Sequence, residues 1–107
     1  MRFRVAEAEG ERFLDQAHAA LRALADRPGY LDGGIGRATD DPTLWLMTLH
    51  WESVGAYRRA LSAYDVKVAA VPLLSTAIDE PTAFELLADA ANRRESDRAA
   101  DSGWRRG

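Results

Sequence analysis

The sequence predicts an α+β domain of the ferredoxin-like class, with the element order strand, helix, strand, strand, helix, strand. Three observations lead to this prediction. The spacing of apolar residues changes between the two-residue period of a strand and the three- or four-residue period of a helix. Turn residues separate the segments. The segment 44–52 has the composition of a long strand that is apolar on both faces.

The N-terminal part is expected to form a strand and a helix. A partial alternation over 3–8 predicts a short first strand, which Gly10 ends. From Glu11 onward the apolar residues recur at helical spacing, so that one helix face carries Phe13, Ala17, Ala20, Leu21 and Leu24. Pro28-Gly29 ends this helix, because proline cannot continue it and glycine tolerates the reversal of the chain.

Turn residues separate the remaining predicted strands and helices. A second strand is expected over 30–39, where Gly33, Gly34 and Gly36 indicate a bulge or the close approach of another group. The turn 40–42 precedes the strand over 44–52, and Ser53 is a suitable N-cap for a helix with Val54, Tyr57 and Leu61 on one face. A further helical stretch over 63–71 is kinked or interrupted at Pro72. After a second turn at 79–81, alternation over 82–87 predicts the last strand.

Length and composition fit one domain. The chain has 107 residues, of which 47% are hydrophobic and 29% charged. We expect the domain to occupy 1–87 and a polar C-terminal tail to occupy 88–107. Trp104 is the exception in that tail, and we interpret it as exposed or packed on a neighbour rather than functional.

Charge and cysteine content narrow the partners and the compartment. The formal net charge is -3, with no clustered basic segment, which argues against a nucleic acid partner. Cysteine is absent, so disulfides and thiolate chemistry are excluded within these residues. No apolar run approaches the ~20 residues of a membrane span, and no signal peptide is recognised at the start. These features predict a cytoplasmic protein that does not bind a membrane.

The strand over 44–52 predicts a homodimer. Alternate residues point to opposite sides, so one face carries Trp45, Met47, Leu49 and Trp51. The other face, with Leu44 and Leu46, is also largely apolar. Helices can cover only one of the two faces in a two-layer domain. We expect a second copy of the chain to cover the face with the tryptophans, because two-fold homodimers are the commonest oligomers. The alternative is that the C-terminal tail folds back over the sheet.

Several short motifs give the chain a family resemblance. These are Arg27-Pro28-Gly29-Tyr30, then Asp40-Asp41-Pro42, then the run from Leu49 through Trp51 and Ser53 to Tyr57. Together they resemble the antibiotic-biosynthesis-monooxygenase family over roughly 3–87. The resemblance implies sheets that pair across a dimer into an α+β barrel. It also implies a pocket between the helices and the sheet of each subunit.

The resemblance implies several activities rather than one. Some members oxidise aromatic polyketides with molecular oxygen and without a metal or flavin, others degrade haem, and others have no known activity. The haem-degrading branch uses an asparagine on the first strand, and a tryptophan and a histidine ten positions apart on the second helix. Here the first strand has no asparagine, and Ala60 and Ala70 occupy the aligned helix positions. We therefore expect no cofactor.

Four residues are candidates for chemistry. Histidine is a residue type suited to proton transfer near neutral pH, and His50 is expected to face the pocket between helices and sheet. Tyr57 and Tyr64, seven positions apart, are expected to share a helix face. We assign His50 and Tyr57 as catalytic candidates, and Tyr64 and Arg37 as substrate-binding candidates. The residues alone favour a structural interpretation over this catalytic one, namely a hydrogen-bonded histidine at a strand end and tyrosines that belong to the core.

Other chemistry finds no support in the sequence. His18 and His50 lie on different elements without ligand-spaced neighbours, so no metal site is predicted. Gly33-Gly34-Ile35-Gly36 lacks the order of a phosphate-binding loop. The leading hypothesis is a cofactor-independent monooxygenase-like protein acting on a small aromatic or quinol-type substrate. The alternatives are a non-catalytic dimeric module that binds a small hydrophobic or aromatic ligand, and an isomerase or cyclase on the same fold.

Overall fold

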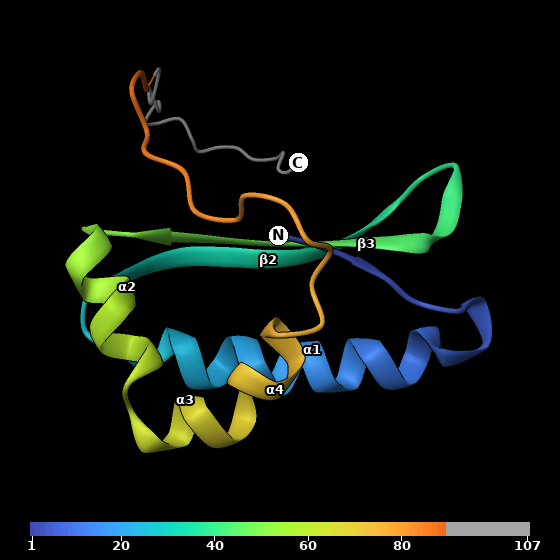
Figure 1. Ribbon diagram of the computed structural model, residues 1–107, viewed down its shortest axis with the longest axis horizontal. Coiled ribbons are helices and arrows are strands. Elements are labelled where there is room, and N and C mark those ends of the chain that lie inside the picture. Colours follow the sequence, from blue (N-terminus) through green and yellow to red (C-terminus); the bar gives the residue numbers. More distant parts are fainter. Residues whose placement is uncertain (90–107) are drawn as a thin grey trace, which may run out of the picture.

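A three-stranded antiparallel sheet with helices on one face forms the body of the molecule (Figure 1). The computed structural model describes residues 1–89. Within them the strand order is β1-β3-β2, with β3 in the centre. The elements are β1 (Arg2–Arg4), the 3-10 helix η1 (Glu7–Glu9), α1 (Gly10–Ala25), β2 (Tyr30–Ala38), β3 (Asp41–Trp51), α2 (Val54–Leu61), α3 (Tyr64–Ala69) and α4 (Val71–Leu74). This architecture confirms the predicted ferredoxin-like class.

Helix α1 has the buried face that the sequence predicts. Phe13, Ala17, Ala20 and Leu24 are buried, and Leu21 is half-buried. The helix starts at Gly10, so the glycine begins the helix, whereas the sequence suggested that it ended a strand. The first strand is also shorter than expected, since β1 spans only Arg2–Arg4 and a 3-10 turn follows.

The sheet face that carries the tryptophans packs against the helices. Trp45 is 6% exposed and Met47 is 1% exposed, and both lie in one cluster with Phe3, Phe13 and Ala17. The ring of Phe13 lies 5.2 Å from that of Trp45, measured between centroids. Leu49 and Trp51 also pack against buried helix residues. The prediction that Trp45, Met47, Leu49 and Trp51 form a dimer interface is therefore wrong, because α1 and the helices that follow already cover this face.

The opposite sheet face is open. We call it the open face, and β3 contributes Leu44, Leu46, Thr48 and His50 to it. Leu46 is 44% exposed there. The two faces are similar in composition, so strand periodicity alone could not decide which of them meets the helices.

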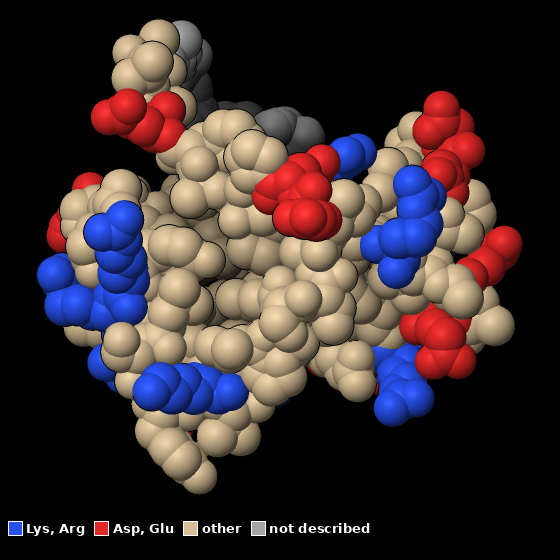
Figure 2. All heavy atoms as spheres, in the orientation of Figure 1, with Lys and Arg blue, Asp and Glu red and all other residues tan. Residues whose placement is uncertain are grey.

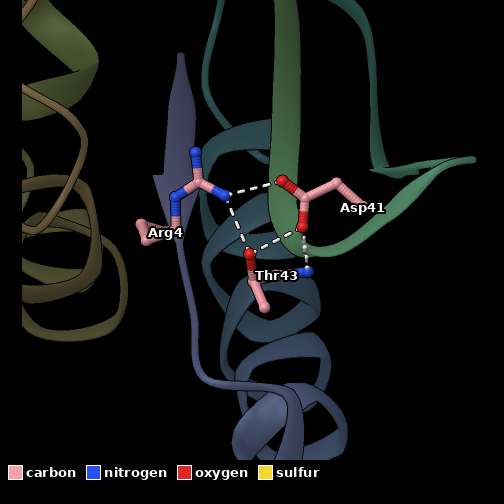
Figure 3. A network of polar contacts seen from close by, with 3 residues as sticks. All are labelled: Arg4, Asp41 and Thr43. Carbon is pink, nitrogen blue, oxygen red and sulfur yellow. Dashed lines mark hydrogen bonds and ion pairs between the residues drawn. The ribbon is translucent and has the colours of Figure 1, made fainter.

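A polar network joins the start of β3 to β1 (Figure 3). Nη1 of Arg4 donates to Oδ2 of Asp41 and to Oγ1 of Thr43, both at 2.8 Å. Oδ1 of Asp41 accepts from the Thr43 amide at 3.0 Å and from the Thr43 hydroxyl at 2.7 Å. The hydrogen bonds from Thr43, and then the one from Arg4, lower the pKa of Asp41 to about 2. The network fixes the hairpin end of β3 against the N-terminal strand.

The second half of the helix layer is divided into short pieces. Ser53 caps α2 as predicted, because its hydroxyl accepts a hydrogen bond from the Ala56 amide at 3.1 Å. Helix α2 ends at Leu61, and α3 begins only at Tyr64. Pro72 lies in the first turn of α4, where its missing N–H costs no hydrogen bond, so the predicted interruption at this proline is confirmed.

The last strand of the prediction is absent from the described part of the chain. Residues 82–87 run without helix or ladder pairing, and Phe84, Leu86 and Leu87 are exposed. A ladder on the outer edge of β1 would be short, because β1 has three residues and the Ile78 amide already donates to Arg2 O at 2.8 Å. Strand 82–87 therefore has too little edge to pair with on its own subunit.

Charged side chains are unevenly distributed over the surface. On the face drawn in Figure 2, the charged side chains lie around the margin and the centre is uncharged. Over residues 1–89, none of the helices combines the length and the apolar character needed to cross a membrane. Most of the predicted tail and Trp104 lie outside the described residues.

Candidate functional site

An aromatic cluster lies where β3 ends and α2 begins. The ring centroids of Tyr30 and Trp51 are 5.5 Å apart with an edge-to-face arrangement, and those of Trp51 and Tyr57 are 5.6 Å apart. Tyr30 begins β2, Trp51 ends β3, and Tyr57 lies on α2. All three side chains are half-buried, so the cluster borders solvent. We call these residues the aromatic cluster.

The turn between α1 and β2 positions this cluster. Gly29 has φ +90°, a conformation that disfavours residues with a Cβ, and its carbonyl accepts from the Glu52 amide at 2.8 Å. A Cβ at Gly29 would lie 2.4 Å from Cβ of Ala56, so the turn presses directly on α2. Tyr30 and Trp51 are then cross-strand partners. The Pro-Gly pair thus places the Tyr30 ring against Trp51.

A glycine also makes room for the Tyr30 hydroxyl. A Cβ at Gly33 would lie 2.8 Å from Oη of Tyr30 and 2.7 Å from the Thr48 carbonyl oxygen. The close approach that the glycine-rich strand predicted is therefore confirmed at Gly33.

The cluster offers hydrogen-bond donors. Desolvation raises the pKa of Tyr57, and desolvation followed by the charge of Asp32 raises the pKa of Tyr30. Both hydroxyls are therefore protonated near neutral pH. Nε1 of Trp51 is buried and has no hydrogen-bond partner among residues 1–89. An indole N–H only donates, and Nε1 of Trp45 and Nε of Arg27 share this unpaired state among the described residues.

His50 lies on the other side of the sheet. It pairs with Asp32 across the strands, and its Nδ1 contacts Oδ1 of Asp32 on the open face. A register shift between Tyr30 and Asp32 turns Asp32 to that face, since residues two apart would otherwise share a side. The expectation that His50 faces the pocket between helices and sheet is wrong. The sheet separates His50 from Tyr57.

Arg37 and Tyr64 do not join the aromatic cluster. Tyr64 is 78% exposed on α3, and the break after Leu61 means that it shares no helix face with Tyr57. Cζ of Arg37 lies 5.4 Å from the ring centroid of Trp45, near the far end of β3. Trp45 and Trp51 are six residues apart on one strand, which corresponds to about 20 Å. The four predicted residues therefore do not converge on one site.

The sequence reasoning missed Tyr30 and Trp51 as site residues. Trp51 was interpreted as packing, and Tyr30 was considered only as the start of a strand. The signal was present in the motifs, because a Pro-Gly turn followed by tyrosine and a strand-ending tryptophan followed by a capped helix meet in one place.

Outside the aromatic cluster, the described residues form a hollow on the open face and bury two alanines in the helix layer. A hollow of about 380 Å³ on the open face lies among Met1, Arg2, Leu46, Glu80, Pro81 and Phe84. Among residues 1–89, no group of three or more histidine or acidic side chains is arranged to hold a metal ion. Ala60 and Ala70 are both buried in the helix layer, where their methyl groups offer no ligand atom to a haem.

Comparison with known proteins identifies the family. The sequence matches the antibiotic biosynthesis monooxygenase family over residues 1–71, so the chain belongs to this family. No curated protein matches it. Two structures of SnoaB, a cofactor-independent oxygenase from Streptomyces nogalater, are 28% and 25% identical to it, one of them a mutant. Each match covers 82% of this chain and 92% of SnoaB, with a TM-score of 0.57.

A protein of lower sequence identity shares the fold. A conserved protein from Methanosarcina mazei Go1 matches with a TM-score of 0.61 and 19% identity, over 75% of this chain and 78% of that protein. The match of the family model confirms the predicted family resemblance, and its range, residues 1–71, includes the sheet and the aromatic cluster.

Proposed function

We propose that this protein is a cofactor-independent monooxygenase-like enzyme that acts on a small aromatic or quinol-type substrate at the aromatic cluster. The observation that carries the proposal is the N–H of Trp51, which has no hydrogen-bond partner within the described part of the chain and whose ring lies beside that of Tyr57. The likeness to SnoaB, which is a cofactor-independent oxygenase, supports it.

The cluster suits a substrate that must become an anion. A hydroxylated aromatic ring can pack against the edge of the cluster, so that its oxygen accepts hydrogen bonds from the Trp51 N–H and the Tyr57 hydroxyl. Donors aimed at a developing phenolate or enolate lower the barrier to its formation. The anion is the species that reacts with oxygen. For an anthrone-like substrate, the ring CH₂ becomes C=O with one oxygen atom, and the second oxygen atom leaves as water.

Oxygen uptake on a panel of anthrones, phenols and quinols tests this proposal. We expect Trp51→Phe and Tyr57→Phe to lower the rate, each by about 10²-fold or more, the usual cost of one such donor. Tyr64→Phe is the matched control, because Tyr64 is exposed on α3 and should leave the rate unchanged. His50→Ala should also leave it unchanged, since the sheet separates His50 from the cluster. Absence of uptake across the whole panel would refute the oxygenase proposal.

One observation favours a second function, a non-catalytic module that binds a small aromatic ligand. His50, the histidine of the sheet, lies on the face away from the cluster and so supplies no base there. Titration of the same panel against tryptophan fluorescence distinguishes the two functions. Quenching that Tyr57→Phe weakens, without oxygen uptake, would select the binding module.

We also propose that the protein is a homodimer that associates through the open face. The helices cover the other face, while Leu46 on the open face is 44% exposed. Apolar surface of this kind marks an interface. Light scattering at micromolar concentration should give twice the mass of one chain. Leu46→Asp should reduce that mass, and the control Val68→Asp, on the exposed side of α3, should not. A wild-type monomer would refute the proposal.

A further inference from the structure

We propose that Tyr30 is a positioning residue: its ring fixes the tilt of the Trp51 indole and so directs the Trp51 N–H towards the substrate oxygen. The Tyr30 hydroxyl itself does not contact the substrate. The inference rests on the proposed function, in which that N–H donates to the substrate. It divides the aromatic cluster into Trp51 and Tyr57, which act on the substrate, and Tyr30, which acts through Trp51.

The indole of Trp51 contacts both tyrosines of the aromatic cluster. Its ring centroid lies 5.5 Å from that of Tyr30, with 82° between the ring planes, and 5.6 Å from that of Tyr57, with 43° between the planes. Tyr30 approaches from β2, and Tyr57 from α2, the helix into which β3 leads (Figure 1). An edge-to-face contact has a preferred geometry, because the positive edge of one ring meets the negative face of the other. The contact with Tyr30 therefore favours one tilt of the indole.

The helix layer leaves this tilt to be decided by the aromatic neighbours. The second torsion of an aromatic side chain has broad energy wells, so its surroundings set the final angle. Trp51 packs against a cluster of buried residues that consists of Ala20, Leu24, Ala60, Val66 and Ala70. Three of these five residues are alanines, whose methyl groups add contact area but few interdigitating contacts. The ring of Tyr30 supplies the directional contact that these methyl groups lack.

The backbone of Tyr30 is itself fixed relative to Trp51. The Tyr30 amide donates to the Arg27 carbonyl at 3.3 Å. The preceding residue, Gly29, accepts a hydrogen bond at its carbonyl from the Glu52 amide at 2.8 Å, and Glu52 follows Trp51 in the chain. Tyr30 and Trp51 are then paired across the strands. The contact between the two rings therefore joins residues whose backbones cannot easily move apart.

The Tyr30 side chain runs along the sheet, away from the end of β3. A Cβ at Gly33 would lie 2.8 Å from Oη of Tyr30 and 3.1 Å from Cδ1 of Leu21 on α1. Gly33 pairs with Leu49, two residues before Trp51 on β3. The hydroxyl of Tyr30 therefore lies between β2 and α1, whereas the ring faces Trp51. This direction suits a residue that supports the indole and does not donate to the substrate.

The direction of the Trp51 N–H should affect the rate more than the binding of the substrate. A hydrogen bond weakens steeply once the angle at the hydrogen falls below about 120°. In the proposed reaction the acceptor is an oxygen whose negative charge grows as the anion forms, so the alignment of the donor counts most in the transition state. A tilted indole should therefore lower kcat and leave KM nearly unchanged.

Steady-state oxygen uptake with anthrone separates positioning from direct contact. Tyr30→Phe keeps the ring and removes only the hydroxyl, so kcat should stay within about 3-fold of the wild-type value. Tyr30→Leu removes the aromatic edge, so kcat should fall by about 10-fold or more while KM changes by less than about 3-fold. Equal losses in the two variants would overturn the proposal, because the hydroxyl would then act on the substrate directly.

Phe13→Leu is the matched control for the loss of an aromatic neighbour. It removes the ring that lies 5.2 Å from Trp45 between centroids, and it leaves the aromatic cluster untouched. Phe13 is 7% exposed, so this substitution also perturbs the core. Its kcat should nevertheless equal that of the wild-type protein. A loss in Phe13→Leu as large as in Tyr30→Leu would assign the effect to general loosening of the fold and would count against positioning.

A double-mutant cycle tests whether Tyr30 acts through Trp51. In the Trp51→Phe background the indole N–H is already absent, so adding Tyr30→Leu should lower kcat by less than about 2-fold further. A further loss as large as that in the wild-type background would show that Tyr30 acts independently of Trp51, and the proposal would be wrong.

The orientation of Trp51 can also be followed without a substrate. Near-ultraviolet circular dichroism reports fixed packing of aromatic side chains, and subtracting the spectrum of Trp51→Phe isolates the bands of Trp51. These bands should persist in Tyr30→Phe and be largely lost in Tyr30→Leu, each compared with its own Trp51→Phe double variant, while the far-ultraviolet spectrum stays unchanged. Bands that persist in Tyr30→Leu would contradict the proposal. If the wild-type protein takes up no oxygen, the proposed function fails, and these bands alone decide whether Tyr30 orients Trp51.

Discussion

Replacing Gly29 by alanine tests how the turn before β2 positions Tyr30. The residue at this position must adopt φ +90°. For a residue with a Cβ, left-handed backbone costs about 1–2 kcal/mol. The added Cβ would also lie 2.4 Å from Cβ of Ala56, about 1 Å inside ordinary contact, and such overpacking costs about 1–3 kcal/mol. The free energy of unfolding should therefore fall by about 2–5 kcal/mol.

A double-mutant cycle with Ala56→Gly separates the two contributions. Ala56→Gly alone should cost about 1 kcal/mol through helix propensity. In Gly29→Ala/Ala56→Gly the overlap is relieved while the backbone strain remains. The double variant should therefore be at least about 1 kcal/mol more stable than the sum of the single effects predicts. Urea unfolding followed by tryptophan fluorescence measures all four proteins. Additivity within about 0.5 kcal/mol would refute the proposed contact between the turn and α2.

The remaining predictions concern the core and the titrating groups. Met47→Ala should lower the free energy of unfolding by about 2–5 kcal/mol, because Met47 is 1% exposed among aromatic rings. The control Val68→Ala, on the exposed side of α3, should change the free energy of unfolding by less than about 0.5 kcal/mol. Equal effects of the two substitutions would contradict the assignment of Met47 to the buried sheet face. The pKa of Asp41 is lowered from 3.8 to about 2 in the folded protein. The Asp41 carboxylate therefore stabilises the fold fully above pH 3.8, the pKa of the unfolded chain, and this stabilisation is lost as the pH falls from 3.8 to about 2. Acid unfolding of Asp41→Asn should lack this part of the pH dependence, and an unchanged profile would show that the network in Figure 3 contributes nothing. The pKa of Tyr57 is raised by desolvation, so the folded state keeps this proton to higher pH and stability should decrease as pH rises above about 10. In absorbance titration, the transition that Tyr57→Phe removes should lie above the ordinary tyrosine value of 10.0.

Elements set by local sequence patterns were predictable. Helix α1 follows from apolar residues at helical spacing, and its end follows from Pro28-Gly29. The Ser53 cap needs only the hydroxyl and the amide three residues later. Strand β3 follows from its composition. In each case, the interactions that decide the structure lie within a few residues of one another.

Features that depend on distant or missing partners were not predictable. The two faces of β3 are alike, so only the packing of Phe13 and Ala17 of α1 decides which is buried. The pairing of His50 with Asp32 depends on a bulge in β2, which periodicity does not reveal. The break between Leu61 and Tyr64 contains neither proline nor glycine. The absence of the last strand reflects the short edge of β1.

The central position of β3 has a consequence for the order in which the chain folds. Its hairpin with β2 closes through a turn at 39–40, so those strands can meet early at little entropic cost. Its other neighbouring strand, β1, is distant in the sequence, since the paired residues Met1 and Met47 are 46 positions apart. Phe3, the most deeply buried aromatic side chain, comes with that late strand. We therefore expect a folding transition state built from the hairpin and α1, in which mutations at Met47 slow folding, whereas mutations at Phe3 mainly accelerate unfolding.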